Sequence, residues 1–247
     1  MTRLLVLQHL EREGPGLFAQ EARARGWELV LCRLDLGEAP PPPQGGDLLL
    51  VLGGPMGVAD VGSPAYPWLE QEVILLRQVL EQSIPVIGVC LGAQLLALAG
   101  GGGACPLLQG EPPLPLREVG YGAITWMLQP SSEPLLAGLD PSELVLHWHG
   151  DRCLLPEGAE LLASSLHCRE QVFRLGPLAV GLQCHLEVEP AMLERWLIED
   201  GDYVVAALGA GGPERIRADA HRWGERVASR GRRLIRNLFD QLDPADC

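Results

Sequence analysis

The sequence predicts an α/β protein with a mostly parallel central sheet flanked by helices. Apolar runs of strand length alternate with longer segments of helical period in the first hundred residues. The run 47–52 is continuously apolar after its first residue, which is typical of a strand buried on both faces of a parallel sheet. The small-residue corner 88–92 joins another apolar run to an Ala- and Leu-rich segment, a pattern that predicts a tight strand-to-helix turn.

The first hundred residues contain four expected strands and three expected helices. We expect strands over 3–8, 27–32, 47–52 and 85–89, and helices over 17–25, 67–82 and 93–99. Pro67 suits the first turn of its helix, where the missing N–H costs nothing. In parallel sheets the active crevice lies outside the carboxyl ends of the strands. The residues that follow 52 and 89 are therefore expected to meet there.

The second half has a different pattern. After the glycine run 100–103, short strands are expected over 116–126, 143–148, 160–165, 171–175 and 178–184, in a region that is partly antiparallel. A helix is expected over 190–199, and the chain from residue 201 onward has mostly helical period. We therefore predict one domain over 1–200 and a C-terminal helical extension over 201–247, packed on it or next to it.

Composition excludes several classes of function. The chain has 247 residues, 47% of them hydrophobic, and a net charge of −13, which disfavours nucleic-acid binding. No apolar run approaches the ~18 residues that span a membrane, and the apolar N-terminal stretch is too short for a signal peptide. The seven cysteines are odd in number and include no C-x-x-C pair, which favours reduced thiols in the cytoplasm over disulfides or a zinc cluster.

Cys90 lies at the predicted strand-to-helix corner. Glycines on both sides leave room for a strained backbone and for the close approach of a substrate. A helix N-terminus and backbone N–H groups beside the sulfur favour a thiolate and a developing oxyanion. The alternative is a buried structural cysteine, which is common in apolar strands. This stretch alone does not decide between a nucleophile and a structural thiol.

His185 and Glu187 form the second candidate group. In an extended strand, residues two apart point to the same side, so this glutamate can accept from one ring nitrogen and orient the other. Cys184 and Leu186 would then face the opposite way. Taken alone, the pair is also compatible with an ordinary surface salt bridge.

His147 and His149 form an H-x-H pair, which is compatible with a metal site, but spacing reveals no third ligand. We therefore expect 148–151 to form a shaped loop at a pocket rim, and no bound metal. The glycine run 100–103 lacks the Lys-Ser/Thr ending of a phosphate loop, and no cofactor is expected. The remaining thiols are expected to be core or incidental residues: Cys32, Cys105, Cys153, Cys168 and Cys247.

Three stretches together resemble the class I (triad) glutamine amidotransferases. They are Gly53-Gly54-Pro55, the run 88–94 around Cys90, and the run 183–187 around His185. The resemblance covers about residues 3–196. Within the family, the chain is similar to the free-standing proteins related to the amidotransferase domain of GMP synthase. Cys184 and Leu186 stand where that family usually has an aromatic residue and proline, and neither change removes a catalytic group. The resemblance implies a flavodoxin-like fold with a nucleophile elbow.

The resemblance also implies roles for individual residues. Cys90 would attack the side-chain amide of glutamine, His185 would transfer the proton, and Glu187 would orient His185. The backbone N–H groups of Gly54 and Leu91 would form the oxyanion hole. Contacts to the substrate are expected from the residues Gly53, Gln94, His149, Gly150 and Asp151.

Three functions follow from this resemblance. The first is hydrolysis of glutamine to glutamate and ammonia, with the ammonia passed to a partner synthetase subunit. The second is a γ-glutamyl peptidase or hydrolase that uses the same triad on a γ-glutamyl amide. The third is a non-catalytic, glutamine-binding regulatory subunit, which the intact Cys, His and Glu disfavour.

Overall fold

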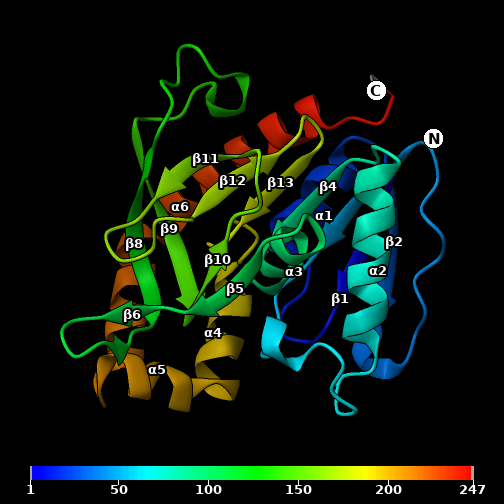
Figure 1. Cartoon of the computed structure of the whole chain (residues 1–247). Helices are drawn as coiled ribbons and strands as arrows, with labels where there is room; N and C mark the ends of the chain where they lie inside the picture. Colours follow the sequence, from blue (N-terminus) through cyan, green and yellow to red (C-terminus); the bar gives the residue numbers. More distant parts are fainter. Residues whose placement is uncertain (1, 246–247) are drawn as a thin grey trace.

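A nine-stranded sheet forms the centre of the molecule (Figure 1). The computed structural model describes residues 2–245, so Cys247 lies outside the described residues. Five neighbouring strands run parallel: β2 (Glu28–Arg33), β1 (Arg3–Gln8), β3 (Asp47–Val51), β4 (Val86–Val89) and β13 (Ala179–Leu182). The sheet continues with antiparallel pairing through β12 (Val172–Leu175), β11 (Ala159–Ser164), β8 (Glu118–Trp126) and β9 (Ser142–His149). The predicted α/β class is confirmed, including the partly antiparallel second half.

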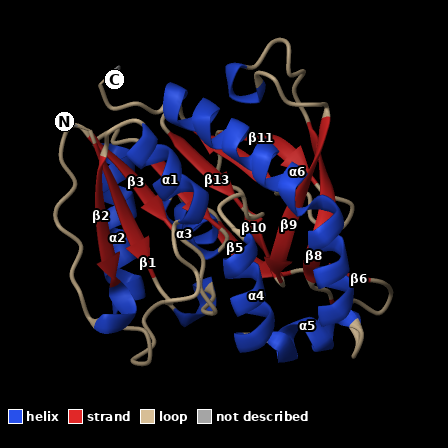
Figure 2. Cartoon of the chain, turned by 180° about the vertical axis from the view of Figure 1, so that it is seen from behind, coloured by secondary structure: helices blue, strands red, loops and turns tan. Residues whose placement is uncertain are grey.

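Helices cover both faces of the parallel strands. Leu4 and Val6 of β1 face the core that includes α1 (Gly16–Ala24) and α6 (Gly212–Gln241). Leu5 and Leu7 face the opposite core, built with α2 (Trp68–Glu81) and α3 (Leu91–Ala99). Figure 2 shows the face that carries α1 and α6. Burial on both sides explains why these strands are continuously apolar.

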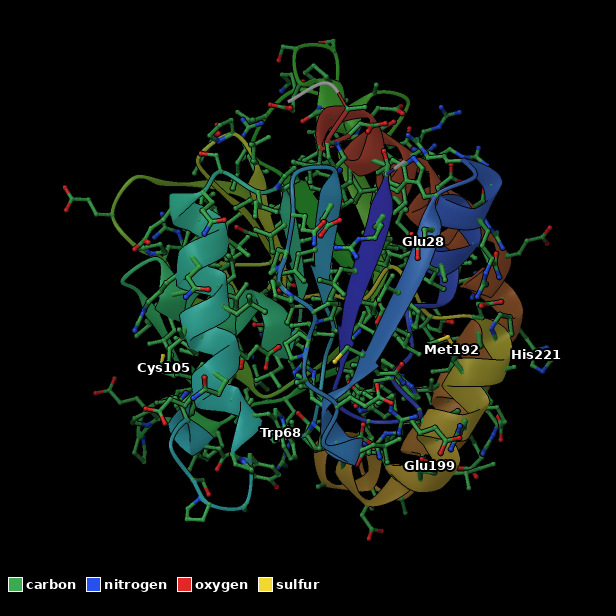
Figure 3. All side chains as sticks on the ribbon, turned by 90° about the vertical axis from the view of Figure 1, so that its right-hand side faces the viewer. Glu28, Trp68, Cys105, Met192, Glu199 and His221 are labelled. Atoms are coloured by element: carbon green, nitrogen blue, oxygen red, sulfur yellow. The ribbon has the colours of Figure 1, made fainter. Side chains whose placement is uncertain are left out.

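The C-terminal helices belong to the same packed structure. α4 (Pro190–Glu199) and α5 (Gly201–Leu208) lie at one end of the sheet, and α6 runs back along it (Figures 1 and 2). Figure 3 looks onto the β2 edge of the sheet. It places Trp68 of α2 and Met192 of α4 on opposite sides of that edge. Phe239 of α6 is fully buried and stacks on Trp27 with ring centroids 4.7 Å apart. The division at residue 200 stays a prediction.

Some local elements differ from expectation. Four short strands were not predicted: β5 (Gly103–Pro106), β6 (Leu108–Gln109), β7 (Leu114–Pro115) and β10 (Asp151–Leu154). β5 pairs with β10, which is distant in sequence, and β6 and β7 form a ladder of only two residues each, so their own residues carry little strand pattern. β13 ends at Leu182, and His185 makes only an isolated bridge to Leu146. The expected strand therefore stops before the candidate histidine. Within residues 2–245, no helix is long and apolar enough to cross a membrane.

The corner between β4 and α3 depends on two glycines. A Cβ atom on Gly92 would lie 2.1 Å from the carbonyl oxygen of Val51, and one on Gly88 would lie 2.5 Å from the carbonyl oxygen of Gly92. Both obstacles are backbone atoms of packed elements, which cannot move aside as a side chain could. Only glycine therefore lets α3 start directly against β3 and β4.

We predict that Gly92→Ala lowers the free energy of unfolding by about 3 kcal/mol or more, because the methyl group overlaps the β3 backbone. Urea denaturation followed by circular dichroism measures this change. Gly201→Ala is the matched control, since a Cβ atom there meets nothing within 4 Å. Equal stability of the Gly92 variant and the control would contradict this account of the corner.

Candidate active site

Cys90 occupies a strained turn between β4 and α3. Its backbone has φ 51° and ψ −107°, in a region that residues other than glycine rarely adopt. Its N–H donates to the carbonyl of Leu182 at 2.7 Å, and the N–H of Gly92 donates to the carbonyl of Leu52 at 3.2 Å. These bonds to the ends of two neighbouring strands hold the turn. The sulfur therefore lies at the N-terminus of α3, as the sequence predicts.

His185 and Glu187 form a buried pair after the end of β13. Nδ1 of His185 lies 2.6 Å from Oε1 of Glu187, and the second carboxylate oxygen accepts from the N–H of Leu186 at 2.9 Å. The N–H of His185 donates to the carbonyl of Leu146 at 2.9 Å. The His185 and Trp196 rings also pack edge to face, with their centroids 4.9 Å apart. These contacts fix the ring even though it does not belong to a strand.

The side chains of Cys90 and His185 meet above Gly53. A Cβ atom on Gly53 would lie 3.4 Å from Cε1 of His185 and 3.5 Å from Cβ of Cys90. Nε2 of His185 is buried and has no hydrogen-bond partner among the described residues. Burial opposes a charge on the ring, but Glu187 and the Cys90 sulfur outweigh it and raise the pKa of His185 well above 6.5. The arrangement favours an imidazolium ring beside the Cys90 sulfur.

Two backbone donors lie beside Cys90. Gly54 and Leu91 both line the cavity that contains the sulfur. Neither N–H has a hydrogen-bond acceptor among residues 2–245. Leu91 is the first residue of α3, where an N–H has no intrahelical partner. Two free N–H groups in this position can donate hydrogen bonds to an oxygen that develops negative charge.

The cavity has a volume of about 450 Å³. Of the residues expected to contact substrate, four line it: Gln94, His149, Gly150 and Asp151. Gly53 does not line the cavity and lies behind it, beneath the two reactive side chains. The Gln94 amide already donates to the side-chain oxygen of Gln183 at 3.2 Å. The Nδ1 atom of His149 lies 2.9 Å from the carbonyl of Asp151.

Sequence reasoning missed five charged or aromatic residues of the wall: Arg12, Glu13, Arg117, Asp200 and Tyr203. Arg12 lies 3.5 Å from Asp200, which accepts from the indole N–H of Trp148 at 2.8 Å. The Arg117 guanidinium lies over the Tyr203 ring at 5.0 Å. Burial raises the pKa of Glu13, despite the nearby His185 ring. These residues come from loops and from α5, and no local motif in the sequence connects them to Cys90.

A buried polar network supports the cavity wall from behind. Glu118 pairs with His149 across β8 and β9, and Oε2 of Glu118 lies 3.2 Å from Nε2 of His149 and 4.0 Å from Nδ1 of His147. The structure therefore supplies the third polar group that spacing did not reveal for the H-x-H pair. The Gln171 amide donates to Glu118 at 2.7 Å and lies 3.2 Å from Nε2 of His149. The Gln171 amide nitrogen therefore lies beside both the Glu118 carboxylate and the His149 ring.

The other buried thiols are poorly suited to act as nucleophiles. Burial raises the pKa of Cys32 to about 11 and that of Cys168 to about 12. Burial also raises the pKa values of Cys153 and Cys184. These thiols remain protonated at neutral pH, and only a thiolate is strongly nucleophilic. Cys184 is fully buried in the core.

His147 should make the fold acid-sensitive. Burial lowers its pKa to about 4, below the 6.5 of an exposed histidine, despite the nearby Glu118. As pH falls below 6.5, the unfolded chain binds the proton first, so the free energy of unfolding should drop by about 3 kcal/mol between pH 6.5 and 4. Urea denaturation of wild type and His147→Gln measures this contribution. The His147→Gln variant should lose this part of the decrease in unfolding free energy with falling pH. His221→Gln, at an exposed position, should keep it.

Comparisons with known proteins identify the family of this chain. The family model described as glutamine amidotransferase class-I matches residues 17–201. The glutamine amidotransferase-like protein YfeJ of Salmonella typhimurium is 32% identical over 188 residues, which cover 75% of each chain. The GMP synthase of Streptococcus thermophilus is 35% identical over 115 residues, 46% of this chain but only 20% of that protein.

The solved structures extend this likeness to almost the whole chain. A glutamine amidotransferase of Thermotoga maritima superposes with a TM-score of 0.83 at 26% identity, and the match covers 98% of both chains. The family model alone covers well over half of the 247 residues. The chain therefore belongs to the class I glutamine amidotransferase family.

Proposed function

We propose that this protein hydrolyses the side-chain amide of glutamine with Cys90, His185 and Glu187 as its catalytic triad. The observation that carries the proposal is the meeting of a strained, positive-φ cysteine and a carboxylate-bound imidazole above Gly53. A nucleophile within reach of a base, itself oriented by a third group, is the arrangement that activates a thiol.

The first half-reaction forms a thioester. The Cys90 thiolate attacks the amide carbon of glutamine, and the carbonyl oxygen becomes negatively charged. The N–H groups of Gly54 and Leu91 stabilise this charge, each by about 3 kcal/mol. His185 has taken the thiol proton and delivers it from Nε2 to the departing nitrogen, so ammonia leaves and the γ-glutamyl thioester remains. Glu187 stabilises the imidazolium and holds its orientation.

The second half-reaction restores the enzyme. Neutral His185 removes a proton from water, which attacks the thioester carbon, and the same two N–H groups hold the second tetrahedral intermediate. Collapse releases glutamate and regenerates the Cys90 thiolate. Gln94, Gly150 and Asp151 line the cavity and are proposed to hold the amino-acid end of the substrate.

The ammonia acceptor would be a partner synthetase subunit. The GMP synthase of Streptococcus thermophilus is named as glutamine-hydrolysing, and this chain matches only 20% of its length. That likeness supports an amidotransferase role in which a separate protein uses the ammonia.

A cytoplasmic location is supported by the six described cysteines, all of which are free.

A γ-glutamyl hydrolase is the second candidate, and the size of the cavity favours it. About 450 Å³ lies in the range that accommodates ligands larger than one amino acid. Arg12 and Arg117 in the wall could bind a carboxylate on a longer leaving group. Product analysis separates the two reactions, because glutamine yields ammonia and a γ-glutamyl conjugate yields a free amine.

We predict that Cys90→Ala lowers the rate of glutamine hydrolysis by about 1,000-fold or more while the circular dichroism spectrum stays unchanged. A coupled assay of ammonia and glutamate measures turnover, with γ-glutamyl amides tested in parallel. Cys105→Ala, at a half-buried position outside the cavity, should retain the wild-type rate. An inactive wild-type protein that still binds glutamine would point instead to a regulatory subunit.

We further predict that a diazo-ketone analogue of glutamine modifies Cys90 alone. The thiols with burial-raised pKa values stay protonated and lie in the core. Peptide mapping by mass spectrometry after limited labelling identifies the site. Preferential modification of Cys184 would mean that the wrong sulfur has been assigned to the triad.

A further inference from the structure

A buried histidine and a buried glutamate lie beneath the backbone that follows β3. Nδ1 of His9 lies 3.0 Å from the carbonyl oxygen of Gly53. Nε2 of His9 lies 3.0 and 2.9 Å from the two carboxylate oxygens of Glu72 on α2. Both side chains are at most 1% exposed.

The contacts determine the protonation of His9. A carbonyl and a carboxylate can only accept, so each ring nitrogen must donate, and the ring is an imidazolium paired with a carboxylate. Burial opposes this charge, but Glu72 and the Gly53 carbonyl outweigh it and raise the pKa of His9. The hydrogen bond to Gly53 is therefore charge-assisted, which makes it stronger than a neutral one.

The same contact sets the direction of the next N–H. The Gly53–Gly54 peptide is trans, so the carbonyl of Gly53 and the N–H of Gly54 point in opposite directions within one plane. The carbonyl is directed toward His9, and the N–H is consequently directed away from it, on the side of the cavity that Gly54 lines. Rotation of this plane would break the bond to His9 before it could turn the N–H away.

We propose that the His9–Glu72 ion pair is a positioning device that aims the Gly54 N–H at the developing oxyanion. The inference rests on the proposed function, because it assigns the pair to the chemistry of Cys90. Neither His9 nor Glu72 lines the cavity, and the pair acts through the backbone.

Burial makes a purely stabilising role a poor explanation of the pair. Desolvating two charges costs free energy that their attraction barely offsets, and apolar residues of similar size often stabilise a core as well or better. The position of the pair instead fits a role in holding the Gly53–Gly54 peptide. A Cβ atom on Gly54 would lie 3.0 Å from Cβ of His9, so the His9 side chain starts close to the residue whose N–H it is proposed to aim.

Two substitutions of His9 separate its two contacts. The amide nitrogen of asparagine can take the place of Nδ1 and still donate to Gly53, whereas that of glutamine takes the place of Nε2 and reaches only Glu72. We expect His9→Gln to lower kcat for glutamine by about 10- to 100-fold, less than the loss of a whole donor because the N–H is displaced rather than removed. His9→Asn should stay within about 5-fold of wild type, and KM should change by less than about 3-fold in both.

Two reactions of Cys90 separate a positioning role of His9 from a merely structural one. Iodoacetamide reacts with Cys90 without forming an oxyanion, so its rate should be equal within about 2-fold in wild type and His9→Gln. An aldehyde analogue of glutamine forms a tetrahedral adduct with an oxyanion, and its affinity should fall in parallel with kcat. Glu72→Gln keeps the Nδ1 donor to Gly53 and removes only its charge assistance, as His9→Asn does, so its selective loss should also stay within about 5-fold.

The controls separate this inference from the proposed function. Glu143→Gln removes another buried carboxylate, paired with Arg230 away from the cavity, and should leave kcat unchanged. If wild type hydrolyses glutamine but His9→Gln loses alkylation and turnover equally, or loses neither, the inference is overturned. If wild type hydrolyses no γ-glutamyl amide, the proposed function fails first.

Discussion

The candidate site depends on the fit of the Cys90 turn against the ends of two strands. Cys90 holds a positive φ, which is unfavourable for a residue with a side chain. Two backbone hydrogen bonds, to Leu182 and Leu52, offset that strain. These carbonyls come from segments that lie on either side of β4 and are distant in sequence. The turn is therefore a product of the assembled sheet, and its glycines let the three segments approach closely.

Buried charges gather around the same end of the sheet. His9–Glu72, His185–Glu187 and the Glu118–His149 network lie under or beside the cavity that contains Cys90. Each histidine contacts both a carboxylate and a further group, so each ring has a defined orientation. Such groups are expensive to bury. Their concentration at one place is understandable if orientation, rather than stability, is what they provide.

The sequence could reveal elements whose signal is local. β1, α2 and β4 were predicted almost to the residue, because their apolar period and their proline or glycine boundaries lie within the element. Cys90 was identified for the same reason, since its glycines are neighbours in sequence. Glu118 was not, because only the pairing of β8 with β9 brings it to His149. The extended strand assumed for His185 and Glu187 was wrong, since β13 ends at Leu182 and the bond from His185 to Leu146 is set by tertiary packing.

The wall of the cavity opposite the elbow has a different origin. The family model ends at residue 201, yet Tyr203 on α5 lines the cavity and carries the Arg117 guanidinium on its ring. Asp200, at the start of α5, accepts a hydrogen bond from the Trp148 indole and lies near Arg12. Cys90, Gly54 and Leu91 all lie within residues 17–201, which the family model matches. Arg12 and Tyr203 lie outside that range, so part of the cavity wall can vary in sequence while the residues around Cys90 stay the same.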